Sequence, residues 1–155
     1  MDAIPVPVQA GERARYNMAF IWLICVAAAM GGLLFGYDWV VIGGAKPFFE
    51  RYFNLTNAAQ KGWANSCALI GCLVGAMVAG AMSDKFGRKR LLIFSAAMFV
   101  VTSLGNSLAP TFGVFVMWRM LGGVAIGLAS NLSPMYIAEI SPAESRGRLV
   151  AINQL

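Results

Sequence analysis

The chain has 155 residues, of which 59% are hydrophobic and only 12% are charged. Because a soluble domain carries roughly 25% charged residues, this composition excludes an ordinary soluble domain and predicts a chain largely covered by lipid. The formal net charge is +5, and the basic residues cluster between apolar segments, which favours a role in membrane topology over binding to nucleic acid.

The order of polar and apolar segments predicts an all-α membrane protein. A polar tail over residues 1–16 precedes a transmembrane domain over residues 17–155. A membrane-spanning helix needs roughly 20 apolar residues at about 1.5 Å per residue. We expect spans over residues 17–44, 62–82, 91–108 and 112–137, with a fifth that begins near residue 149. Pro47 is expected to end the first helix, and loops are expected over residues 46–61, 83–90 and 138–148.

The distribution of lysine and arginine predicts the orientation. The tail, the loop after the second span and the loop after the fourth together hold eight basic residues. The loop after the first span holds only Lys46, Arg51 and Lys61. Cytoplasmic loops carry the excess of basic residues, so we expect a multi-pass protein of the cell (inner) membrane with a cytoplasmic N-terminus.

The remaining composition argues against an enzyme. The chain has no histidine, and its three cysteines, Cys25, Cys67 and Cys72, lie within apolar segments without metal-ligand spacing. We interpret them as packing residues. No nucleophile motif or phosphate-binding glycine loop is present. No metal and no cofactor are therefore expected.

Two charged residues lie well inside the predicted spans, Asp38 in the first and Arg119 in the fourth. Counting from Pro47 and Phe112 at about 1.5 Å per residue places them roughly 13 and 10 Å below the same membrane face. Opposite charges at one depth predict an ion pair. The pair has two readings: a static contact that fixes helix packing, or a protonatable carboxylate that takes up a proton when Arg119 moves away.

Glycines recur at four-residue spacing in the second and fourth spans, as Gly71 and Gly75 and as Gly123 and Gly127. Small residues at this spacing let helices approach closely within a membrane. They predict tight helix packing and nothing more specific.

Several segments together resemble the sugar porter branch of the major facilitator superfamily. The run Gly80-Ala81-Met82-Ser83-Asp84-Lys85-Phe86-Gly87-Arg88-Lys89 matches its cytoplasmic signature G-x-x-x-D-[RK]-x-G-R-[RK]. Phe35-Gly36-Tyr37-Asp38, Arg119 and the segment Pro134–Leu155 are also similar to that branch, which includes proton-coupled symporters for sugars such as D-xylose and facilitative glucose carriers.

The resemblance implies roles for individual residues. Asp38 would take the coupling proton and Arg119 would tune it, while Phe35 and Gln154 would contact the sugar, a pentose or hexose. Facilitative carriers have a neutral residue in place of Asp38, so the aspartate favours symport. A salt-bridge network that closes the cytoplasmic side would include Asp84, Arg88, Glu139 and Arg146, and the signature adds Gly80, Gly87 and Lys89.

The resemblance also implies partners and leaves alternatives open. The family binds sugar between two transmembrane halves, and this sequence stops as the fifth span begins. We therefore expect a fragment, or a truncated product, that lacks the C-terminal half. The expected function is the N-terminal part of a monosaccharide–proton symporter that works by alternating access. The alternatives are a facilitative carrier, a non-transporting sugar sensor and a truncated membrane scaffold.

Overall fold

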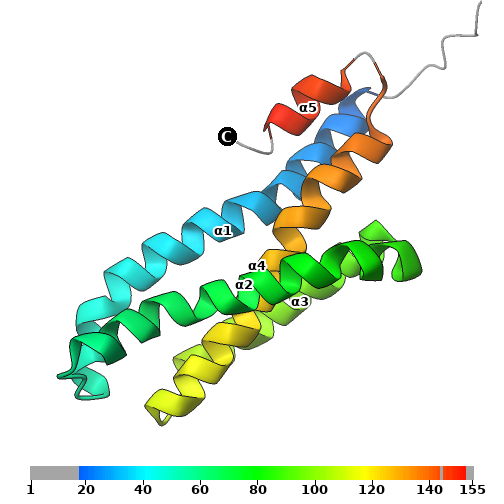
Figure 1. The fold of residues 1–155 in the computed structure, drawn as a ribbon. Helices are drawn as coiled ribbons and strands as arrows, with labels where there is room; N and C mark the ends of the chain where they lie inside the picture. Colours follow the sequence, from blue (N-terminus) through cyan, green and yellow to red (C-terminus); the bar gives the residue numbers. More distant parts are fainter. Residues whose placement is uncertain (1–17, 144, 153–155) are drawn as a thin grey trace, which may run out of the picture.

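The computed structural model describes residues 18–143 and 145–152, and it describes Met18–Phe20, Phe35 and Ile152 by their backbone only. This part of the chain is all-α, as predicted, and contains no strand. Figure 1 shows the helices α1 (Met18–Tyr52), α2 (Ala58–Phe86), α3 (Arg88–Ser107), α4 (Phe112–Ile140) and α5 (Arg146–Ile152). Within the described ranges, four of them are long and apolar enough to cross a membrane, α1 to α4.

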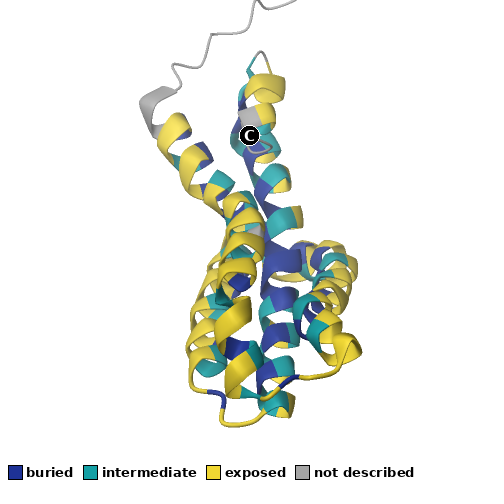
Figure 2. Cartoon of the chain, turned by 90° about the vertical axis from the view of Figure 1, so that its left-hand side faces the viewer, coloured by how far each residue is buried: buried dark blue, intermediate teal, exposed yellow. Residues whose placement is uncertain are grey.

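Helix α4 forms the centre of the bundle. In its most apolar stretch 50% of the residues are buried, against 18% in α1 and 17% in α3. In Figure 2 the buried residues follow this central helix, while the outer helices are largely exposed. The exposed side chains include large apolar ones such as Leu23, Val40, Leu73 and Met77. Such apolar outer faces suit a chain whose surroundings are lipid.

The two glycine pairs lie on facing helices. A Cβ atom added at Gly71 or Gly75 of α2 would overlap the backbone of α4, and one added at Gly123 or Gly127 would overlap the backbone of α2. The glycines of each helix therefore admit the carbonyl groups of the other. This close approach confirms the predicted tight packing and fixes α2 against the first half of α4.

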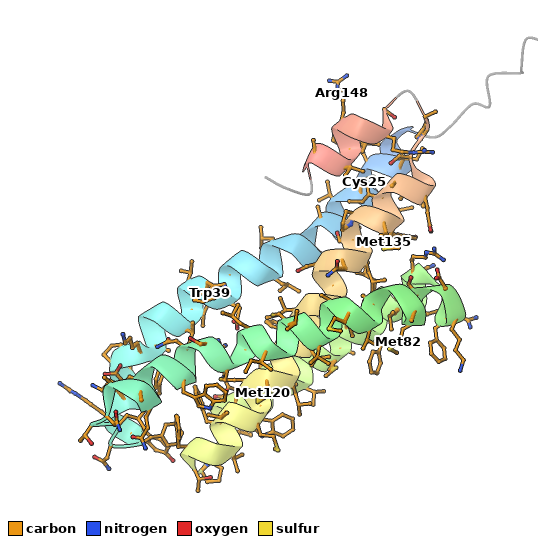
Figure 3. All side chains as sticks on the ribbon, viewed as in Figure 1. Cys25, Trp39, Met82, Met120, Met135 and Arg148 are labelled. Carbon is orange, nitrogen blue, oxygen red and sulfur yellow. The ribbon has the colours of Figure 1, made fainter. Side chains whose placement is uncertain are left out.

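The second half of α4 packs against the first half of α1 and against α5. Cys25, which Figure 3 labels in this region, is 2% exposed and packs in a cluster with Ile137 and Leu149. The Ser133 hydroxyl donates a hydrogen bond to the backbone carbonyl of Ala28. Helix α1 thus meets α4 at both ends of the bundle: its first half packs with α5 on the second half of α4, and its second half packs on the first half of α4.

Pro47 does not end the first helix, so that prediction is wrong. Helix α1 continues through Pro47 to Tyr52, and the connection to α2 is only residues 53–57. Tertiary contacts outweigh the backbone hydrogen bond that proline removes. Phe49 packs its ring 5.3 Å from that of Phe115, and Glu50 lies 2.9 Å from Lys61 of α2.

The other helices also extend beyond the expected spans. The charged segment 83–90, expected as a loop, is helical except for Gly87, and α4 continues to Ile140. Helix α5 begins at Arg146, before the apolar run at residue 149. Hydropathy marks only the apolar part of a helix, whereas lysine, arginine and glutamate are good helix formers that prolong it into the polar surroundings.

Candidate functional site

Helices α1 and α4 bring Asp38 and Arg119 together inside the bundle. Nη1 of Arg119 donates a hydrogen bond to Oδ1 of Asp38 over 2.8 Å, and the two side chains are 16% (Asp38) and 7% (Arg119) exposed. The ion pair predicted from the depth of the two residues is therefore present. A buried charge is costly without a partner, so each residue supplies the counter-charge that the other needs.

Two further helices face this buried ion pair. Helix α2 brings Cys72 and Asn65 to a small pocket that Asp38 and Arg119 also line. Helix α3 brings Thr102, Ser103 and Asn106 to the opposite side. The pair thus lies where four helices meet, surrounded by neutral polar groups and thiols.

An open cavity of about 1010 Å³ reaches the buried ion pair. It lies between α1, α3 and α4, and residues of the connection after α3, Leu108 and Ala109, line its other end. Its walls are largely aromatic and aliphatic, and Ser103, Asn106 and Ser107 supply polar groups from α3. The cavity gives the carboxylate of Asp38 contact with a space large enough for solvent.

The polar residues of α3 were not predicted from the sequence as part of this site. Thr102 and Asn106, and Ser103 and Ser107, are each four residues apart, which is the spacing that places side chains on one helix face. That periodicity within an otherwise apolar span was the available signal. It could not indicate which helix the polar face would meet.

A second group of predicted residues meets at the surface, at the ends of α2, α3 and α4. Nε of Arg88 lies 2.7 Å from Oε1 of Glu139, and Nη2 of Arg88 lies 3.1 Å from Oδ1 of Asp84. The Asp84 side chain is 73% exposed and that of Glu139 is 48% exposed. We call these three residues the Arg88 network. Ion pairs this exposed contribute only about 0–1 kcal/mol to stability.

The signature residues around this network have different surroundings. Gly87 alone separates α2 from α3 and has a φ of 83°, a left-handed conformation that favours glycine. A Cβ at Gly80 would meet no atom within 4 Å, so nothing in the structure explains that glycine. Lys89 and Arg146 are exposed and make no ion pair within the described part of the chain.

The two residues expected to contact sugar are not placed by the structure. Phe35 lies in α1, but only its backbone is described, and Gln154 lies outside the described residues. The residues that the structure does describe contain no group of three histidine, cysteine or carboxylate side chains able to hold a metal ion.

Comparison with known proteins identifies the family of this chain. The model of the family described as "Sugar (and other) transporter" matches residues 24–155. The chain belongs to this sugar transporter family. With its apolar helices, family membership makes it a multi-pass membrane protein.

Individual relatives agree with the family match. The chain is 41% identical to a glucose transport protein of Synechocystis over 149 residues, which cover 96% of this chain and 32% of the relative. It is 40% identical to the galactose-proton symporter of Escherichia coli, over 94% of this chain and 31% of that protein. The chain thus spans about a third of the length of these relatives.

Solved structures match the helix arrangement as well. The proton:xylose symporter XylE, a protein of the major facilitator superfamily, aligns with a TM-score of 0.82 and 38% identity, over 90% of this chain and 34% of XylE. An inward-open structure of XylE from E. coli aligns with a TM-score of 0.80 and 36% identity, over 86% of this chain and 36% of XylE. The fold is therefore that of the major facilitator superfamily, as the resemblance implied.

Proposed function

We propose that this chain forms the N-terminal part of a secondary active transporter that carries a monosaccharide together with a proton. The observation that carries the proposal is the buried ion pair of Asp38 and Arg119, which borders an open cavity. A carboxylate with an arginine partner stays ionised, and the same carboxylate buried without that partner favours its protonated form. A movement that separates the two helices at this point would therefore load Asp38 with a proton, and its reversal would release it.

The relatives support the choice of symport over facilitated diffusion. Similar proteins include symporters for galactose and for xylose, both with protons. In a facilitative carrier nothing would require a titratable residue at position 38, whereas a symporter needs one that exchanges protons with solvent. The substrate class is a pentose or hexose, and we assign Phe35 and Gln154 to its recognition.

The orientation and the Arg88 network complete the proposal. The protein lies in the cell membrane with its N-terminus in the cytoplasm. The Arg88 network is then on the cytoplasmic side, and the cavity opens on the opposite side of the membrane. The exposed ion pairs of the Arg88 network add little to stability, which suits contacts that must form and break during alternating access. Arg146 and Lys89 would join them when the second transmembrane half is in place.

The test compares coupled with uncoupled transport in the complete carrier that contains this chain. Asp38→Asn keeps the size and polarity of the side chain but cannot release a proton. We expect it to abolish sugar accumulation against a gradient while sugar exchange across the membrane continues. Normal uphill accumulation by the variant would contradict the proposed role of Asp38.

A further inference from the structure

A small second pocket lies beside the buried ion pair, between α3 and α4. Its volume is about 20 Å³, and polar side chains in its lining are Asp38, Thr102, Ser103, Asn106 and Arg119. A space of roughly 10–15 Å³ is enough to hold a water molecule. The pocket therefore has room for a single water and is far too small for a sugar.

Two buried polar atoms from the lining of this pocket lack hydrogen-bond partners within the described residues. They are Nε of Arg119 and Oδ1 of Asn106. Arg119 is 7% exposed and uses Nη1 for Asp38, so its Nε–H group is a separate buried donor. Asn106 Oδ1 is an acceptor. Buried polar groups in proteins are normally satisfied by protein or by an ordered water.

A water molecule in the pocket would complete this set of hydrogen bonds. It can accept from Nε–H of Arg119 and donate to Oδ1 of Asn106. The Thr102 hydroxyl already donates to the Phe99 carbonyl over 3.0 Å, so its oxygen lone pairs can accept the second proton of the water. Buried waters typically make about three hydrogen bonds, which is the number available here.

We propose that this pocket binds one ordered water that joins Arg119 to Asn106, and that Asn106 is a positioning residue for the proton switch. The role in coupling rests on the proposed function. With the water in place, Arg119 keeps a hydrogen-bonded partner when Asp38 becomes neutral. Asn106 and Ser103 line both this pocket and the open cavity, so the water lies next to the cavity that reaches the ion pair.

The surrounding charges leave Arg119 as the main partner of Asp38. From α4 the facing charged group is Arg119, and α3 contributes only neutral side chains. Helix α2 contributes the thiols of Cys67 and Cys72, and α1 itself contributes the phenols of Tyr37 and Tyr52 to the cavity wall. Within the described chain, no second carboxylate borders these pockets.

Two substitutions remove the water in independent ways. Asn106→Leu keeps the approximate size of the side chain and removes the acceptor. Gly122→Ala leaves every polar group in place and adds a methyl group to the lining of the pocket, 3.3 Å from Oγ1 of Thr102. Alanine is a better helix former than glycine, so the second variant should fold even where the first does not.

The measurement is the pH dependence of uphill sugar uptake by the complete carrier, with sugar exchange as a second readout. Without the water, Nε of Arg119 has no hydrogen-bond partner, so opening of the contact with Asp38 costs more and proton-driven uptake requires a more acidic medium. We expect both variants to shift the pH of half-maximal uptake to the acid side by about one to two units, the size of one lost hydrogen bond to a charged group. Exchange should continue.

Matched controls are Asn131→Leu and Gly113→Ala on α4. Asn131 is exposed and its amide donates to the Gly127 carbonyl of its own helix, and a Cβ at Gly113 would meet nothing within 4 Å. Both should retain the parent pH profile. A structure of the unmutated carrier should also show a water oxygen about 2.9 Å from Nε of Arg119 and from Oδ1 of Asn106.

Three results would overturn the inference. A parent pH profile in either Asn106→Leu or Gly122→Ala would exclude the water from coupling. Loss of exchange together with uptake in both variants would make the pocket a packing element only. If either result occurs while Asp38→Asn behaves as proposed, only the role of the water is rejected. The third result is normal uphill uptake by Asp38→Asn, which would reject the symport proposal and, with it, the role of the water in coupling.

Discussion

At the scale of residues, Asp38 and Arg119 are each tolerable within the bundle only because the other is present. Taking two ions out of water is costly, and their attraction at 2.8 Å offsets that cost. Removal of one partner leaves a buried charge without compensation. The intact pair adds little to stability, but loss of either partner is strongly destabilising. A small net energy for the pair suits a switch that must open and close.

A double-mutant cycle tests this mutual dependence. We expect Arg119→Gln alone to destabilise the protein by about 3–5 kcal/mol, because Asp38 is left buried and unpaired. The double variant Asp38→Asn/Arg119→Gln should recover most of that loss, since two neutral amides can hydrogen-bond to each other. Thermal unfolding of the purified carrier in detergent measures both. Losses that simply add would mean that the two residues are not coupled.

The sequence was sufficient to predict the ion pair but not its surroundings. Two charges in apolar spans at similar depth have few ways to be satisfied, so Asp38 and Arg119 were paired correctly. Asn106 has no such constraint, because a neutral amide can be satisfied by water, backbone or a neighbouring helix. Its relation to Arg119 depends on how α3 rotates against α4, which no local pattern records.

At the scale of elements, the contact of α2 with α4 depends on the absence of four side chains. Each glycine of the two pairs faces a backbone carbonyl of the opposite helix: Gly71 faces Met120, Gly75 faces Val124, Gly123 faces Ala68, and Gly127 faces Cys72. Backbone atoms cannot move aside as a flexible side chain can. A methyl group at any of these positions must therefore separate the helices.

Gly75→Ala tests this packing. We expect a loss of stability of about 1–3 kcal/mol, the usual cost of overpacking, despite the better helix propensity of alanine. Gly62→Ala on the same helix is the control, because a Cβ there meets no atom within 4 Å. It should leave the free energy of unfolding unchanged or raise it by up to about 1 kcal/mol, because alanine is the better helix former. Equal unfolding temperatures for the two variants would be inconsistent with the close approach.

The sequence predicted the elements themselves better than their ends. Tight packing followed from the glycine spacing, although the spacing could not say that α2 and α4 would pack on each other. The end of α1 was misplaced because tertiary contacts decide it, and the end of α2 because charged helix formers prolong the helix past the apolar span. Phe49 and Glu50 hold α1 helical beyond Pro47, and a single glycine at position 87 is enough to turn the chain between α2 and α3.

At the scale of the whole molecule, the arrangement of the helices separates two kinds of contact. The interface of α2 with α4 consists of close backbone contacts, while the Asp38–Arg119 pair and the Arg88 network are ionic. Helix α1, which carries Asp38, is mostly exposed, with 18% of its apolar stretch buried. Because α1 carries Asp38 and α4 carries Arg119, the proposed opening of the ion pair is a movement of these two helices relative to each other at this point.

In the proposed mechanism, sugar movement is coupled to protons through Asp38. The direct measurement is the pH of a lightly buffered medium around de-energised cells that contain the complete carrier, after a sugar substrate is added. Coupled entry removes protons from the medium, so we predict a sugar-dependent rise in external pH that is absent in Asp38→Asn. Sugar entry without any change in external pH, with Asp38 intact, would exclude proton coupling.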